Sequence, residues 1–232
     1  MLSVLAKGKT LSTGYELRSS DPSVRVSYLR SKAFAVAIKR LFDVVGSLLG
    51  LIFIAPLFPL IALAIRLDSP GPIFFRPRII GYGGREFLAY KFRTMDPRAL
   101  ETLLQDPNLL NQYKENLKIA NDPRITRVGR WLRLTSLDEL PQLINVLKGE
   151  MSLVGPRMLA ELELEKFGEH RNKILSVKPG MAGLWVASGR QTLSFDRRLE
   201  LELQYVDNWS LWLDAKCFCK TLVIAIRMVG AG

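Results

Sequence analysis

The sequence predicts an α+β fold that is mostly α-helical: a re-entrant membrane helix followed by a small cytoplasmic domain with a β-hairpin and interfacial amphipathic helices. Three observations support this prediction. An uncharged apolar stretch runs from Val44 to Ile65. Two β-rich segments flank a glycine-rich turn at 81–84, and helical apolar spacing recurs in the second half of the chain. With 232 residues, the chain has room for one well-cored domain and an appendage.

The apolar stretch fits a bilayer, which a helix of about 20 residues can span. Pro56 and Pro59 lie in its middle, where each removes a backbone donor and disfavours a straight helix. Basic residues flank it on both sides, and the positive-inside tendency would hold both flanks in the cytoplasm. A helix that enters one leaflet, breaks and returns satisfies both observations. A kinked single span remains an alternative, and a buried helix of a soluble core is less favoured.

Charge placement supports a membrane partner. Net charge is +11, and residues 1–100 hold 15 of the 33 Lys and Arg residues but 6 of the 22 Asp and Glu residues. This excess brackets the apolar stretch, which favours an anionic membrane surface over nucleic acid. The two cysteines, Cys217 and Cys219, are separated by one residue, which is too close for relaxed disulfide geometry. A disulfide-stapled scaffold is therefore excluded, and a reducing, cytoplasmic setting is indicated.

Downstream of a turn at 68–72, the pattern predicts two strands, Ile73–Ile80 and Arg85–Phe92, joined by a glycine-rich hairpin turn. No helix opens after these glycines, so turn chemistry explains them better than dinucleotide binding. Residues 98–120 predict a helix followed by a polar connection. Further helices are predicted at 125–134, 140–147, 161–170 and 199–205, with a loop beside a short strand at 177–188.

The segment 209–229 mixes aromatic, apolar and basic residues, which is typical of a helix at the bilayer interface. A helix that docks on the core is an equally good interpretation. The chain therefore divides into a flexible basic arm (1–33), a re-entrant membrane helix (34–67), a catalytic domain (68–208) and a C-terminal interfacial helix (209–232).

Two adjacent carboxylates, Asp138 and Glu139, open an apolar helix. Capping explains them well, because Ser136-x-x-Glu139 matches a capping box and acidic first turns complement the helix dipole. Pro141 complicates that explanation, since its missing N–H would fall past the first turn if Ser136 were the N-cap. Spacing alone favours capping over catalysis without excluding either.

Basic residues around this pair favour a phosphate site. They are Arg124, Arg127, Arg130 and Arg133 before it, and Arg157 and Arg190 after it. The dipole and the cations are expected to keep a carboxylate ionised there, so Asp138 is a candidate nucleophile toward a phosphoanhydride. Two carboxylates with a diphosphate also suit Mg²⁺. The sole histidine, His170, argues against a zinc site or a Ser-His-Asp triad.

Seven stretches occur in the order and form known from one family. They are Lys39–Asp43, Tyr90–Met95, Ser136–Gln142, Asn145–Arg157, Lys178–Gly180, Ser188–Arg190 and Asn208–Asp214. Through them, residues 36–232 resemble the bacterial monotopic phosphoglycosyl transferases, the sugar transferases that initiate exopolysaccharide, O-antigen and glycoprotein-glycan assembly. The likeness is to the shorter members, which lack extra membrane helices.

The resemblance implies transfer of a sugar 1-phosphate from a UDP-sugar to undecaprenyl phosphate, with Mg²⁺ as cofactor and UMP as product. It implies a monotopic protein at the cytoplasmic face of the bacterial inner membrane, in contact with membrane lipids. Asp138 would be the nucleophile that carries a covalent phosphosugar, and Glu139 would assist by metal or proton handling, so that both carboxylates form the metal site. The implied phosphate-binding residues are Lys91, Arg133, Arg157 and Arg190, and the implied helix break is Ala55-Pro56.

Three positions depart from the family pattern: Val186 stands where Gln is common, Met158 where Pro is usual and Ala182 where Thr is frequent. The loss of Gln removes one expected polar contact near the donor. Two rival functions remain: a basic membrane-associated scaffold without catalysis, and a glycosyltransferase that moves only the sugar and releases UDP. No nucleic-acid partner is expected, and the sequence leaves the sugar and a homo-oligomer open.

Overall fold

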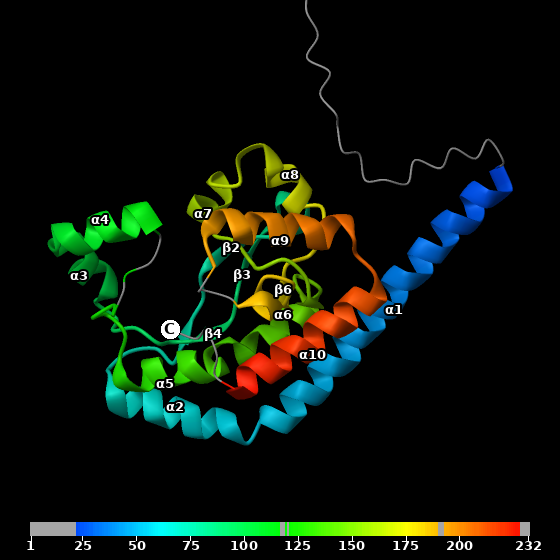
Figure 1. Cartoon of the computed structure of the whole chain (residues 1–232). Helices are drawn as coiled ribbons and strands as arrows, with labels where there is room; N and C mark the ends of the chain where they lie inside the picture. The colour runs from blue at the N-terminus through cyan, green and yellow to red at the C-terminus, as the bar shows by residue number, and fades with distance from the viewer. Residues whose placement is uncertain (1–21, 117–118, 120, 190–192, 228–232) are drawn as a thin grey trace, which may run out of the picture.

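The computed structural model describes residues 22–116, 119, 121–189 and 193–227. Residues 1–21 of the expected arm lie outside this range, and residues 22–33 belong to helix α1 (Pro22–Ile54). The described chain is mostly helical with short strands, which confirms the predicted α+β class. Figure 1 shows α1 and α2 (Leu57–Asp68) along one side of the domain, with α5 (Arg127–Thr135) and α10 (Leu211–Arg227) next to them.

The first two helices meet at the predicted break. No single helix in the described ranges is long and apolar enough to cross a membrane, but Ala33–Ile54 and Leu57–Asp68 meet the requirement as a pair bent by 62°. The bend lies at Ala55 and Pro56, where Pro56 occupies the N-cap position of α2. Pro59 falls in the first turn of α2, where an N–H has no intrahelical partner, so its ring is tolerated. Membrane insertion of the pair stays a prediction.

This geometry gives a topology experiment. Pro56→Ala restores a backbone donor at the break, so part of the population should adopt a straight, fully spanning helix. Single cysteines introduced at Ser31 and Arg85, with Cys217 and Cys219 replaced by serine, report sidedness through a membrane-impermeant thiol reagent. Both sites should label only from the cytoplasmic side in the parent, and Ser31→Cys should become partly accessible from outside in Pro56→Ala. Pro59→Ala is the matched control, and a parent whose two sites label from opposite sides would contradict the re-entrant model.

Three charged residues of α1 attach this helix to the domain. The Lys39 Nζ donates to the Val154 carbonyl at 2.8 Å and to Asp214 at 2.6 Å. The Arg40 guanidinium donates to two carbonyls at the end of α6 (Leu143–Lys148). The Asp43 carboxylate accepts from the Ser152 hydroxyl and the Leu153 amide of β5 (Ser152–Val154). Helix α1 and the strand that precedes Arg157 are therefore one connected unit.

Within the described residues, the strands form three short pairs. β2 (Arg78–Ile80) and β3 (Glu86–Leu88) make the predicted hairpin, and Gly83 and Gly84 provide the positive φ angles of its turn. The expected longer strands are interrupted, because Pro77 cannot donate to a ladder. The outer parts pair separately as β1 (Phe74–Phe75) and β4 (Lys91–Phe92), and β5 runs parallel to β6 (Gly180–Ala182).

Two predicted helices are shorter than expected. The described part of the predicted segment 98–120 contains α3 (Ala99–Gln105) and α4 (Pro107–Asn116), because Pro107 starts a new helix whose first amides are capped by the Asp106 carboxylate. The segment 161–170 divides into α7 (Glu161–Glu165) and a 3₁₀ turn at Gly168–His170, followed by α8 (Arg171–Ile174). Helix α9 (Phe195–Asp207) contains the predicted segment 199–205.

Helix α10 combines both interpretations of the C-terminal segment. Its Cys217 is buried against Val154, Ala182 and Tyr205, and Asp214 accepts from Lys39, Tyr205 and Trp209. Its exposed side carries both large apolar residues and lysines; they are Trp212, Lys216, Phe218, Lys220, Leu222 and Val223. One face therefore docks on the core, and the other is available to a bilayer interface.

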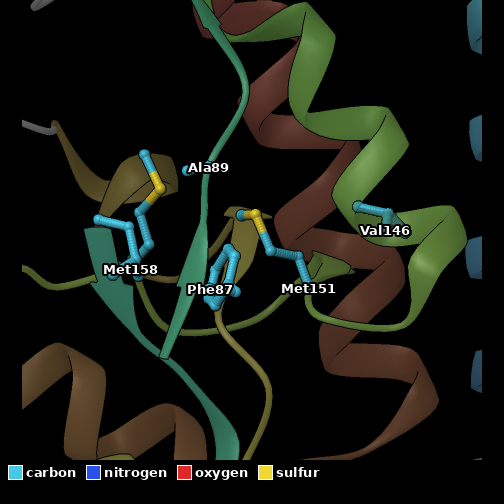
Figure 2. Packing of buried hydrophobic residues seen from close by; sticks show 6 residues of the cluster. Phe87, Ala89, Val146, Met151 and Met158 are labelled. Carbon is cyan, nitrogen blue, oxygen red and sulfur yellow. The ribbon is translucent and has the colours of Figure 1, made fainter. Parts of the chain in front are cut away.

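A sulfur-rich core lies between the hairpin and α6. Figure 2 shows Phe87, Ala89, Val146, Met151 and Met158 packed together. Met158, which replaces the usual proline, fills this core with an adaptable side chain. The core thereby joins the hairpin to the loop that carries Arg157.

Candidate active site

The two carboxylates lie on a six-residue 3₁₀ turn, Leu137–Gln142, between α5 and α6. Ser136 ends α5 in the left-handed conformation and makes no capping hydrogen bond through its side chain. The predicted Ser136 capping box is therefore wrong, although both carboxylates do lie in the first turn of the 3₁₀ segment. The α-helix predicted from Leu140 begins at Leu143 instead. Pro141 lies inside the 3₁₀ turn. The Glu139 side chain is therefore not engaged in a capping box with Ser136 and can interact with other residues.

Glu139 is held by two cations. Its carboxylate accepts hydrogen bonds from Arg157 Nη2 at 2.6 Å, Arg157 Nη1 at 3.1 Å and Lys91 Nζ at 3.0 Å. Burial opposes ionisation of Glu139, but Arg157 and then Lys91 outweigh it and hold the pKa of this carboxyl well below its usual range. Glu139 in turn raises the pKa of Arg157. This two-pronged pair orients the guanidinium as a charge-assisted fork.

Asp138 has a different environment one residue away. It is buried, its Oδ2 lies 3.6 Å from Lys91 Nζ, and within the described residues its carboxylate accepts no hydrogen bond. Burial raises the pKa of Asp138, Lys91 lowers it, and the negative Glu139 raises it further. Desolvation is the largest effect on this pKa, and the cations that would lower it further pair with Glu139. That Asp138 is ionised stays a prediction.

Of the four arginines before the pair, Arg133 faces the carboxylates. Its Nε donates to Thr94 Oγ1 at 2.9 Å, burial lowers its pKa, and the negative charge of Asp138 opposes that shift. Arg124 is instead buried in a two-pronged pair with Asp122, while Arg127 and Arg130 are exposed. The four arginines therefore have different surroundings, and Arg133 is the one whose charge interaction with Asp138 and Glu139 the structure shows.

Close backbone packing fixes the position of Arg133. A Cβ at Gly129 would lie 2.0 Å from the carbonyl oxygen of Thr94, so only glycine lets α5 approach the chain beyond β4 this closely. The same approach brings the Arg133 side chain to Thr94. The placement of this guanidinium thus depends on a residue four positions earlier in the same helix.

Two expectations concern the segment at 185–190. Arg190 lies outside the described residues, so its role stays a prediction. Val186 is buried with Trp185 and Leu201, so apolar packing occupies the position where the resemblance implies a glutamine. The Trp185 ring lies 5.8 Å from the Arg157 guanidinium, which makes it a neighbour of the carboxylate site.

The two carboxylates, Asp138 and Glu139, fit Mg²⁺ only together with a phosphate ligand. In the described part of the chain, no group of three or more His, Cys, Asp or Glu side chains can hold a metal. Mg²⁺ is commonly held by one or two carboxylates, several waters and substrate phosphates rather than by a complete protein cage. Asp138 and Glu139 supply such a pair, which fits a magnesium ion bound with a diphosphate.

The sequence interpretation missed Glu202, which contacts the site through Arg157. The Glu202 Oε1 accepts a hydrogen bond from the Arg157 amide at 3.0 Å, and the side chain is 1% exposed. A signal was present, because Glu202 lies between Leu201 and Tyr205 on the buried face of α9. A carboxylate in an apolar stripe is unusual and indicates a specific partner.

Comparison with known proteins identifies the family. The family model described as bacterial sugar transferase matches residues 34–228. The chain is 42% identical over 212 residues to the UDP-galactose-lipid carrier transferase of Erwinia amylovora, covering 90% of this chain and 44% of the relative. It is 41% identical over 212 residues to the undecaprenyl-phosphate galactose phosphotransferase of Salmonella typhimurium, with the same 90% and 44% coverage.

A relative of similar length also matches. The exopolysaccharide production protein ExoY of Rhizobium meliloti is 42% identical over 188 residues, which cover 79% of this chain and 83% of that protein. The chain spans less than half the length of the first two relatives. All seven stretches that carried the resemblance fall within the matched range. The chain therefore belongs to the bacterial sugar transferase family.

Proposed function

We propose that this protein transfers a sugar 1-phosphate from a UDP-sugar to undecaprenyl phosphate and releases UMP, as the first membrane step of a polysaccharide or glycoconjugate pathway. One observation carries the proposal: a buried Asp138–Glu139 pair faced by Lys91, Arg133 and Arg157. A cluster of cations around a carboxylate that accepts no hydrogen bond from the described residues suits phosphoryl transfer. The names of the relatives from Salmonella and Erwinia support the donor and the acceptor.

The basic residues would hold the donor diphosphate. Arg157 presents a fork whose geometry matches phosphate oxygens, Lys91 adds a point charge, and Arg133 approaches from α5. By the resemblance, Arg190 contributes a fourth cation. Binding the diphosphate here aims its sugar-bearing phosphorus at Asp138.

Asp138 is the better nucleophile of the two carboxylates. Glu139 is bound to two cations that lower its pKa, whereas the pKa of Asp138 is raised. An oxygen of Asp138 would attack the sugar-bearing phosphorus, the bond from that phosphorus to the bridging oxygen would break, and UMP would leave. A phosphate oxygen of undecaprenyl phosphate would then attack the same phosphorus and release the Asp138 carboxylate. Each step forms and breaks one P–O bond.

Mg²⁺ would neutralise charge on the diphosphate when bound, and Asp138 and Glu139 are the residues that would hold it. Glu139 would also keep Arg157 oriented before the donor arrives. Lys91, 3.6 Å from Asp138 and 3.0 Å from Glu139, would balance the charge of the pair as the phosphosugar forms and leaves.

The proposed location is the cytoplasmic face of the bacterial inner membrane, where the protein is monotopic. The bent pair α1–α2 exposes apolar side chains on both arms; among them are Leu48, Ile52, Phe53, Leu60, Leu63 and Leu67. Such a surface suits membrane lipids and the polyprenyl chain of the acceptor. A soluble donor and a membrane-bound acceptor can then use one site in turn.

Nucleotide release tests this proposal directly. The full chain in lipid nanodiscs, supplied with Mg²⁺ and undecaprenyl phosphate, should release UMP from at least one of UDP-glucose, UDP-galactose, UDP-N-acetylgalactosamine and related donors. Chromatography separates UMP from UDP, and a reaction without the lipid gives the background. Release of UDP would instead indicate a glycosyltransferase that moves only the sugar, and no release from any donor would favour the scaffold.

A further inference from the structure

Helix α9 contributes a buried carboxyl group that the proposed reaction does not use. Glu202 belongs to α9 yet reaches Arg157, 45 residues earlier in the chain. Within the described residues its Oε1 has the Arg157 amide as partner, and its Oε2 has none. A buried polar group without full pairing costs stability, so core packing does not explain this side chain.

The peptide bond between Pro156 and Arg157 is held from both ends. The Pro156 carbonyl accepts a hydrogen bond from the Gly180 amide at 2.7 Å, and the Arg157 amide of the same peptide donates to Glu202 at 3.0 Å. Both groups of a planar unit are therefore fixed. This fixes where the Arg157 side chain leaves the backbone.

The direction of that side chain matters because Arg157 meets Glu139 through two parallel hydrogen bonds, at 2.6 and 3.1 Å. A long side chain reaches such a geometry only from a well-placed backbone. We propose that Glu202 is a positioning residue whose carboxyl group holds the Pro156–Arg157 peptide, so that the Arg157 guanidinium stays on Glu139 and faces the donor phosphates. The inference rests on the proposed function for the role of Arg157.

Neighbouring groups on α9 support this placement. Arg198, one turn before Glu202, lies over the Trp185 ring at 4.7 Å and donates to Glu163 at 3.2 Å. The Trp185 ring also lies 5.8 Å from the Arg157 guanidinium, so Arg157 has contacts with both α9 and Trp185. Burial raises the pKa of Glu202 to about 7, while the Arg157 amide and the charge of Arg198 lower it. Oε1 can accept the amide hydrogen bond in either protonation state.

A matched pair of variants isolates the hydrogen bond. Glu202→Gln keeps an acceptor oxygen, and Glu202→Met keeps the shape without a strong acceptor. Glu202→Met should lower kcat/KM for the UDP-sugar by about 10- to 100-fold, because small misplacements of a positioning group are costly. Glu202→Gln should recover most of the activity. Glu200→Leu is the control, since Glu200 is exposed on the same helix and pairs with Arg197 at the surface.

Coupling to Arg157 separates positioning from general damage. If Glu202 acts through Arg157, then Glu202→Met should cost little more in an Arg157→Ala background. The proposal would be overturned if the losses in kcat/KM from Glu202→Met and Arg157→Ala simply added in the double variant. It would also be overturned if the Gln and Met variants lost the same activity and that loss paralleled the fall in their thermal unfolding temperatures. Should the Met variant not fold, Glu202→Leu replaces it in the comparison with Gln.

A binding readout separates this inference from the proposed function. The affinity for UDP with Mg²⁺, measured by calorimetry, should fall about tenfold in Glu202→Met, and the double variant should bind UDP no more weakly than Arg157→Ala alone. Weakened UDP binding without any UMP release from the parent protein would refute the proposed function and uphold the positioning role. If the parent releases UMP and Glu202→Met has the same UDP affinity and kcat/KM as the parent, the proposed function is supported and the positioning role is refuted.

Discussion

Asp138→Asn is expected to abolish turnover while leaving the protein folded. The amide matches the carboxylate in size but is a poor nucleophile, so UMP release should fall by at least about 10³-fold, in the range seen when a catalytic nucleophile is removed. Asp138 accepts no hydrogen bond within the described residues, and burial already disfavours its charge. The thermal unfolding temperature should therefore change little.

Intact-protein mass spectrometry provides the decisive measurement. Wild-type protein mixed with UDP-sugar and Mg²⁺, without undecaprenyl phosphate, should gain the mass of a sugar phosphate, and peptide mapping should place it on Asp138. Asp138→Asn should show no adduct. Glu139→Gln is the matched control on the neighbouring position, with slow turnover expected but an adduct still trapped. Normal turnover by Asp138→Asn would refute the covalent mechanism.

Local chemistry explains which parts of the fold were predictable. The helix break at Ala55-Pro56 and the hairpin turn at 81–84 follow from proline and glycine, whose backbone preferences act without help from distant residues. The end of α6 at Gly149 has the same origin, since this residue has a positive φ of 82°. Pro77 and Pro107 act in the same local way. Pro77 divides the strand predicted at Ile73–Ile80, and Pro107 divides the helix predicted in 98–120.

The arrangement of the site depends on contacts between residues that are far apart in the sequence, and the spacing of residues along the chain does not reveal such contacts. Asp138 and Glu139 are adjacent, yet Arg157 selects Glu139, and burial acts on Asp138 in the opposite direction. Four arginines precede the pair in the sequence, but Arg124 forms a buried salt bridge with Asp122 instead. The position of Glu202 on an apolar helix face indicated some partner, but that partner is the backbone amide of Arg157, which side-chain patterns in the sequence do not identify.

Arg157→Lys is expected to cause the second large loss. Lysine keeps the charge but cannot make two parallel hydrogen bonds to Glu139 or to a phosphate. Loss of one such contact in the transition state should cost about 2–4 kcal/mol, or roughly 30- to 10³-fold in kcat/KM for the UDP-sugar. The side chain is 24% exposed and its partner 14%, so solvent screens the pair only partly.

Arg157→Ala tests the same contact through stability. Removing the guanidinium leaves Lys91 as the one cation bonded to Glu139 among the described residues, and breaking a buried pair on one side costs about 3–5 kcal/mol. Its unfolding temperature should therefore fall well below that of Arg157→Lys, which retains a charge near Glu139. Arg127→Lys, an exposed arginine of α5, is the control and should match wild type in both measurements. If Arg157→Lys keeps near wild-type kcat/KM in nanodiscs, the fork between Arg157 and the donor phosphates is ruled out, and Lys91 and Arg133 must carry the diphosphate without it.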